Sequence, residues 1–133
     1  MSQKGRWSYR LIPSLKDWLA RVHGEVNFFS TQLLSGHGCF RSYPHRFRHA
    51  TSPKCAWCAN GEDETAEHVL FRCGRFYIER EHLEAELGEQ ITVSNLVPMI
   101  IRRRENWEAF NKFAAIAMTD AAVIMHIMQR SCL

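Results

Sequence analysis

Four metal-binding side chains within a short stretch constrain this chain more than any other feature. The stretch begins Cys55-Ala56-Trp57-Cys58, continues for nine residues to His68, and for four more to Cys73. Two cysteines at this spacing can bind one ion from a single tight turn, and the later pair can close a tetrahedron. Three sulfurs and one nitrogen complete a structural zinc site and leave no position for a catalytic water. We therefore predict one structural Zn²⁺ held by Cys55, Cys58, His68 and Cys73.

Two alternatives to zinc stay open for the cysteine pair: a redox disulfide, or buried cysteines without a ligand. A redox pair of the thioredoxin type opens a helix after a strand, whereas Ser52-Pro53-Lys54 precedes this one in a loop. Two other histidines, His37 and His45, compete for the fourth position from outside the spacing. Cys39 and Cys132 are expected to be small core residues or free thiols.

The cysteine count also bears on the compartment. Five is an odd number, and the first residues contain no apolar stretch typical of a secretion signal. Clustered cysteines in a reducing compartment more often bind metal than form disulfides. We expect an intracellular protein, in the nucleus, the cytoplasm or both.

Apolar periodicity predicts a mainly α fold, a small helical domain with an embedded CCHC zinc-binding element. A composition that is 46% hydrophobic, with eight Phe and four Trp, can supply a modest core. Ser14, Asn27 and Thr65 are expected to cap helices, while residues 1–13 are expected to be extended. The expected helices lie near 14–23, 27–35, 39–47, 65–71, 75–87, 94–103 and 105–130.

We divide the chain into three segments that form one compact domain overall. They are a basic helical N-terminal segment (1–50), the CCHC zinc element (51–76) and the C-terminal helices (77–133). The most apolar stretch, 113–128, is interrupted by Asp120 and His126 and is too short to cross a membrane. We expect no membrane partner.

Charge is distributed unevenly along the chain. The net charge is +3, but residues 1–54 carry nine Lys/Arg against two acids, and the remainder carries eight against twelve. A basic region interleaved with aromatic rings can bind single-stranded nucleic acid through phosphate contacts and base stacking. Among the aromatic rings near the zinc element, Trp57 and Phe76 are the candidate stacking platforms. The basic residues could instead form only a solvated surface. The candidate nucleic-acid-binding residues are Arg46, Arg48, Lys54, Trp57, Arg72 and Arg75.

Catalytic patterns are scarce. The three aspartates, Asp17, Asp63 and Asp120, lie far apart in the sequence, and there is no Gly-rich phosphate loop. We predict that this chain is not an enzyme and takes no small-molecule substrate. The acidic residues beside the zinc element are expected to form a solvated turn; they are Glu62, Asp63, Glu64 and Glu67.

Several motifs together closely resemble the C-terminal part of insect non-LTR retrotransposon pol proteins, over nearly the whole chain. They are His23-Gly24-Glu25-Val26, the run 31–40, His45-Arg46-Phe47, the C-x-x-C pair, the run 66–73 with Arg75-Phe76, Asn95-Leu96-Val97 and Asn106-Trp107-Glu108-Ala109-Phe110. Pro44 departs from the leucine expected in this pattern.

The resemblance implies a zinc-knuckle region that follows the reverse transcriptase domain and binds nucleic acid during target-primed reverse transcription. It implies that Cys55, Cys58, His68 and Cys73 are the matching ligands, and that the polymerase and endonuclease residues belong to a part of the parent polyprotein not represented here. The expected function is zinc-dependent binding of RNA or DNA, in single-stranded form, with the upstream reverse transcriptase as a further possible partner. The alternative is a helical protein-interaction domain that does not bind nucleic acid, with the apolar helix 105–130 packing on a partner.

Overall fold

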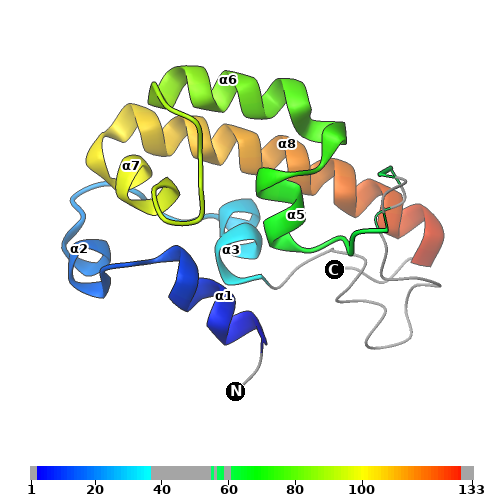
Figure 1. Ribbon diagram of the computed structural model, residues 1–133, viewed down its shortest axis with the longest axis horizontal. Coiled ribbons are helices and arrows are strands. Elements are labelled where there is room, and N and C mark those ends of the chain that lie inside the picture. The colour runs from blue at the N-terminus through cyan, green and yellow to red at the C-terminus, as the bar shows by residue number, and fades with distance from the viewer. Residues whose placement is uncertain (1–2, 37–54, 56, 59–60, 130–133) are drawn as a thin grey trace.

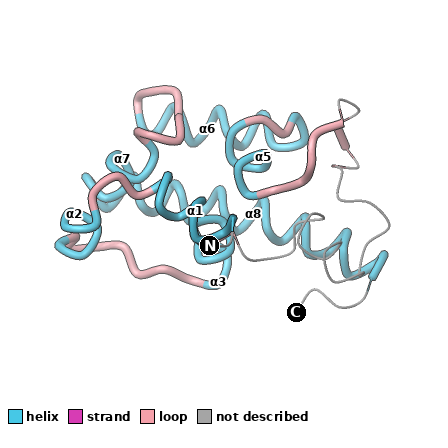
Figure 2. Tube along the Cα trace, turned by 60° about the horizontal axis from the view of Figure 1, so that its bottom comes forward, coloured by secondary structure: helices cyan, strands magenta, loops and turns pink. Residues whose placement is uncertain are grey.

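The structure is a computed structural model that describes residues 3–36, 55, 57, 58 and 61–129, with the backbone alone described at 3–6 and 120–129. Its regular structure consists of helices joined by loops (Figures 1 and 2). The mainly helical fold predicted from the sequence is confirmed. The helices are α1 (Gln3–Leu11), α2 (Leu15–Ala20), α3 (Phe28–Ser35), α5 (Ala66–Phe71), the 3₁₀ helix η1 (Gly74–Phe76), α6 (Tyr77–Leu87), α7 (Leu96–Arg102) and α8 (Arg104–Gln129).

Short polar residues start three of these helices as expected. The side chains of Ser14, Asn27 and Thr65 each accept a hydrogen bond from a backbone N–H in the first turn of α2, α3 and α5. These bonds satisfy N–H groups that have no partner within the helix. Gly36 and Gly88 end α3 and α6 in the left-handed conformation that glycine adopts without steric cost.

The expectation of an extended N-terminus is wrong, because residues 3–11 form helix α1. Trp7 and Leu11 lie one turn apart on this helix and are both buried. The Trp7 indole N–H donates to the Leu33 carbonyl at 2.8 Å, and the Ser8 hydroxyl donates to the Leu34 carbonyl at 2.8 Å. Contacts with α3, distant in sequence, therefore stabilise this nine-residue helix.

The core gathers around the long helix α8, which packs against α3, α6 and α7 (Figure 1). Phe110, Phe113 and Met118 of α8 are buried within this chain. These large side chains of α8 are thus covered by the chain's own helices. Among the described residues, no helix is long and apolar enough to cross a membrane.

The expected helix at 39–47 lies outside the described residues. Buried residues from all three sequence segments belong to one hydrophobic cluster. The segment boundaries themselves stay a prediction. We use the name metal-site segment for Cys55, Trp57, Cys58 and residues 61–76, which include α5 and η1.

Candidate metal centre

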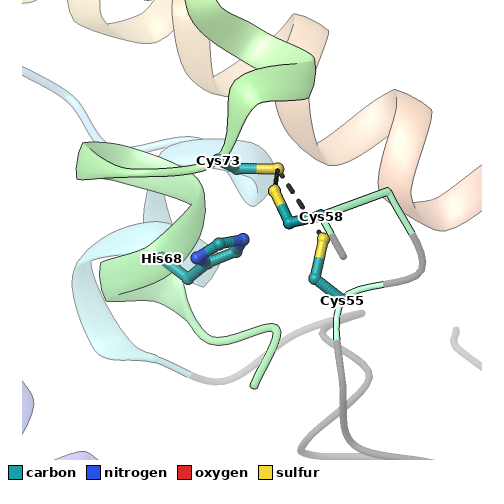
Figure 3. Close-up of side chains that lie close together, drawn as sticks. All are labelled: Cys55, Cys58, His68 and Cys73. Atoms are coloured by element: carbon teal, nitrogen blue, oxygen red, sulfur yellow. Dashed lines mark hydrogen bonds between the residues drawn. The ribbon is translucent and has the colours of Figure 1, made fainter. Parts of the chain in front are cut away.

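The four residues singled out by spacing lie together in the fold, with their side chains directed toward one another (Figure 3). One ligand atom from each residue lies within 4.8 Å of all the others. His68 and the two outer cysteines are buried, and Cys58 is half-buried. A compact, mostly buried set of three sulfurs and one imidazole is suited to a metal ion.

Local backbone structure explains how the ligands converge. Thr65 caps α5, and its hydroxyl accepts a hydrogen bond from the His68 N–H, which fixes His68 in the first turn. The chain leaves α5 at Arg72, and the Cys73 N–H returns to the His68 carbonyl at 2.7 Å. The Cys55 N–H donates to the Glu62 carbonyl at 2.9 Å, which holds the first cysteine beside the approach to α5.

The sulfur positions fit a tetrahedral thiolate site. Cys73 Sγ lies 3.8 Å from Cys55 Sγ and 3.9 Å from Cys58 Sγ. A tetrahedron with Zn–S bonds of about 2.3 Å has an edge of about 3.8 Å between sulfurs. These sulfurs are too far apart for a disulfide bond, which measures about 2.05 Å.

The two ring nitrogens of His68 have different surroundings. Nδ1 lies 3.1 Å from Glu62 Oε2, whereas Nε2 is buried and has no hydrogen-bond partner among the described residues. Carboxylates commonly bind the distal nitrogen of a metal-ligating histidine and thereby fix its tautomer. An Nδ1–H donated to Glu62 leaves a lone pair on Nε2, so the otherwise unsatisfied atom is the one available to a metal.

Glu62 belongs to a charged network around the histidine. Its carboxylate accepts a hydrogen bond from Arg72 Nε at 2.6 Å as well as from His68. The Arg72 hydrogen bond lowers the pKa of Glu62, with a smaller contribution in the same direction from His68. Arg72 also reaches Glu67, which in turn pairs with Arg10 of α1. The expectation of a solvated acidic turn is therefore wrong for Glu62.

Glu64 was expected in the same solvated turn, but it is only 3% exposed. Arg75 Nη2 lies 3.5 Å from its Oε2, and the Arg75 guanidinium lies over the Phe76 ring at 4.6 Å. This ion pair is buried, so it holds the chain after Cys73 in place. The expectation of a solvated turn is therefore wrong for Glu64 as well.

Burial would keep the Cys73 thiol protonated without a cation. It raises the pKa of the Cys73 thiol from 9.0 to about 12, and the nearby Cys55 sulfur raises it further, while the Arg75 backbone N–H acts in the opposite direction. A bound metal reverses this preference because the thiolate is the ligand. Three thiolates with Zn²⁺ would carry one net negative charge.

Arg80 of α6 supplies a cation near that charge. Arg80 was not among the residues predicted from the sequence. Its side chain is 9% exposed and donates to the carbonyls of Leu70, Val69 and Cys73 at 2.7, 2.8 and 3.0 Å. These bonds satisfy carbonyls at the end of α5 and at the fourth ligand. An arginine seven residues after Cys73 is the only trace of this support in the sequence.

The candidate nucleic-acid-binding residues that the structure describes differ in how far their side chains are exposed. Arg46, Arg48 and Lys54 lie outside the described residues. Trp57 is 64% exposed, and the Arg72 side chain is 46% exposed although it pairs with two glutamates. The Arg75 side chain is 8% exposed, so it lies mostly out of solvent.

Phe76 is 2% exposed and packs edge-to-face on Phe113. The expectation that it could stack on a base is therefore wrong. Core packing between η1 and α8 uses this ring instead. Trp57 is the stacking candidate that reaches solvent.

One comparison with known proteins bears on this site. The chain is 25% identical over 101 residues to the retrovirus-related Pol polyprotein from type-1 retrotransposable element R1 4 of Nasonia vitripennis. The alignment covers 76% of this chain and 24% of that polyprotein. No protein-family model matches the sequence, and no solved structure matches it. The chain is thus similar to about a quarter of a retrotransposon Pol polyprotein and contains a cluster that could hold a metal ion.

Proposed function

We propose that this chain is a CCHC zinc-knuckle module that binds nucleic acid, derived from the Pol polyprotein of a non-LTR retrotransposon. The observation that carries the metal part is the convergence of three sulfurs on His68 Nε2, a buried nitrogen without another partner. Sulfur-rich tetrahedral sites favour Zn²⁺ over hard cations such as Mg²⁺.

Single-stranded RNA or DNA is the proposed ligand. The exposed Trp57 ring lies between two candidate ligands and could stack on a base, and Arg72 lies at the edge of the site. Arg46, Arg48 and Lys54 precede the first cysteine closely in sequence and would add phosphate contacts. The similarity to a retrotransposon Pol polyprotein supports this choice of ligand.

In the parent polyprotein, the module would hold nucleic acid for target-primed reverse transcription while other domains carry the chemistry. We propose that this chain itself is not catalytic, acts inside the cell in the nucleus or cytoplasm, and packs beside the upstream reverse transcriptase. A saturated structural site is consistent with a binding role because it leaves no position for a reacting water.

A protein-interaction domain is the second candidate. One observation favours it: Leu15, Leu19 and Val22 are 63%, 71% and 93% exposed, near helix α2. Apolar side chains grouped on a surface can mark a partner site. Binding to a protein through such side chains would depend weakly on salt, which separates this candidate from nucleic-acid binding.

The metal part is tested by elemental analysis of the chain purified under reducing conditions. One zinc per chain is expected, and His68→Ala should lose it because Nε2 is removed. His82→Ala is the matched control, since His82 is exposed and lies outside the cluster. A metal-free parent protein, or equal zinc retention by both variants, would contradict the proposed site.

The ligand is tested by titrating single-stranded RNA and DNA against salt. Each phosphate contact contributes about 0.7 to the slope of log affinity against log salt for single strands, so Arg48→Ala should flatten the slope. Trp57→Ala should leave the slope unchanged and lower affinity by about 1–3 kcal/mol per stacked base. Parent-like binding by both variants would favour the second candidate.

A further inference from the structure

A groove of about 310 Å³ runs between α6 and α8, on a part of the molecule that the proposed metal site does not use. The two helices lie side by side and run in opposite directions (Figure 1). Leu83 and Phe113 form the buried floor, Ala109 is half-buried, and Ile116 is 42% exposed at the side. The floor is therefore apolar, and Ala109 and Ile116 are the apolar lining side chains that reach solvent.

Glutamates line the rim of this groove from both helices. Glu79 and Glu86 come from α6, and Glu105 and Glu108 come from α8. Glu105 pairs with Arg103 at 3.5 Å, whereas no ion pair of the other three occurs among the described residues.

The positive side chains on this rim are few. Lys112 and His82 are the other titratable residues that line the groove. The rim is thus negatively charged, although the chain as a whole has a net charge of +3. This charge repels phosphate groups and anionic lipid, so nucleic acid and anionic membranes are poor occupants of the groove.

The spacing of the lining residues suggests the shape of the occupant. Residues 79, 83 and 86 recur at helical spacing on α6, as do 105, 109, 112 and 116 on α8. Eleven residues of helix extend about 16 Å, or three turns. A groove between two antiparallel helices, apolar at its floor and acidic at its rim, matches a helix with an apolar stripe flanked by positive charges.

We propose that the α6–α8 groove binds a cationic amphipathic helix of a partner protein, with its apolar stripe against Ala109 and Ile116 and its Lys or Arg side chains paired with Glu79, Glu86 and Glu108. The complementary charge between rim and ligand selects this occupant. The inference does not rest on metal or nucleic-acid binding, and it stands if either of those fails.

The test uses the full chain and three labelled synthetic peptides of about four helical turns, measured by fluorescence anisotropy. The first has leucines at helical spacing flanked by lysines, the second has glutamates in place of the lysines, and the third contains the residues of the first in scrambled order. We expect binding of the first peptide alone. Equal binding of the glutamate or scrambled peptide, or no binding of the first, would overturn the proposal.

Variants of the rim and floor then locate the contact. Glu86→Gln and Glu108→Gln should each weaken binding by up to about fivefold, as exposed ion pairs do. Ile116→Ser should weaken it by removing apolar contact. Glu81→Gln is the matched control: it makes the same charge change on α6, and Glu81 does not line the groove. Equal weakening by Glu81→Gln would mean that only general charge attracts the peptide.

Direct binding measurements separate the remaining occupants. Binding of labelled single-stranded RNA or of anionic vesicles to the chain should not be weakened by Ile116→Ser, and weakening by this variant would assign the groove to that ligand and overturn the proposal. Self-association of the free chain that Glu86→Gln and Glu108→Gln abolish would identify a second copy as the occupant and overturn the proposal of a separate partner.

Discussion

The metal-site segment and the α7–α8 pair of this small domain are ordered by different means. In the metal-site segment, α5 has six residues, too few to be stable by themselves. Its shape depends on caps, on returns of the chain to His68, and on four side chains that converge around one point. In the α7–α8 pair, 33 residues form helices that bury Leu96, Ile100, Phe110 and other large side chains.

The two regions therefore have different sources of stability. Apolar burial contributes about 25 cal/mol for each Å² removed from water, and long helices with a broad apolar face obtain most of their stability in this way. A short segment with few large apolar side chains needs ligand bonds instead, and structural zinc sites contribute folding free energy directly. Metal removal should therefore affect the two regions unequally.

Chelation of the metal is expected to have the largest effect. Structural zinc contributes about 10–16 kcal/mol in isolated zinc-finger peptides, and the helical core should retain part of the fold here. Amide hydrogen exchange should show loss of protection in α5 and η1, with protection of α7 and the first half of α8 largely retained. Uniform loss along the chain would mean that the two regions form a single cooperative unit.

Phe110→Ala should weaken the helical core and leave the metal site intact, the opposite of metal removal. Phe110 is fully buried, and removal of its ring should destabilise the protein by about 3–5 kcal/mol through lost burial and a cavity. Denaturant unfolding measures the loss, and zinc stoichiometry of the folded variant should stay at that of the parent. A variant that folds but loses its zinc would show that the core controls the site more directly than the contrast implies.

Gly24→Ala tests a close approach in the helical region. Gly24 has φ +98°, and a Cβ there would lie 2.8 Å from the Trp107 ring. The left-handed backbone costs about 1–2 kcal/mol for a residue with a Cβ, and overpacking typically adds about 1–3 kcal/mol.

Gly88→Ala is the matched control for this effect. Gly88 has φ +82°, and nothing lies within 4 Å of its Cβ position, so only the backbone cost applies. Thermal melts should show the larger loss for Gly24→Ala, and zinc content should not change in either variant. Equal losses would mean that the Trp107 ring moves aside without strain.

Arg80→Met tests the support that α6 gives to the metal-site segment. The apolar stem is retained, while the carbonyls of Leu70, Val69 and Cys73 lose their donor. Unsatisfied buried acceptors cost about 1–3 kcal/mol. Because two of these carbonyls end α5, zinc affinity should fall together with stability.

The control for Arg80→Met is Arg102→Met at an exposed position, where substitutions usually change stability by less than about 0.5 kcal/mol. Denaturant unfolding and competition with a zinc chelator measure the two effects. A stability loss without a change in zinc affinity would limit Arg80 to packing between α5 and α6.

Features whose causes lie within a few residues could be predicted from the sequence. Ser14, Asn27 and Thr65 cap helices because a short polar side chain can reach the N–H groups of the next turn. Gly36 and Gly88 end helices because glycine tolerates positive φ. The ligand spacing placed Cys55, Cys58, His68 and Cys73 in one group for a similar reason: tight turns and one short helix fix their separation.

Features that join distant parts of the chain depend on the tertiary structure. Helix α1 is stabilised by its packing on α3, where the Trp7 indole bonds to the Leu33 carbonyl, 26 residues away in sequence. Local helix propensity contains no information on such a contact. The same holds for Gly24 against the Trp107 ring.

Burial also separates residues that composition alone treats alike. Phe76 and Trp57 are both aromatic residues of the metal-site segment, but one packs on Phe113 and the other lies in solvent. Glu62 and Arg80 become supports of the site because folding brings a carboxylate to His68 and a guanidinium to the end of α5. Hydrogen bonds between elements depend on the packing of those elements, and that packing is set by the whole chain.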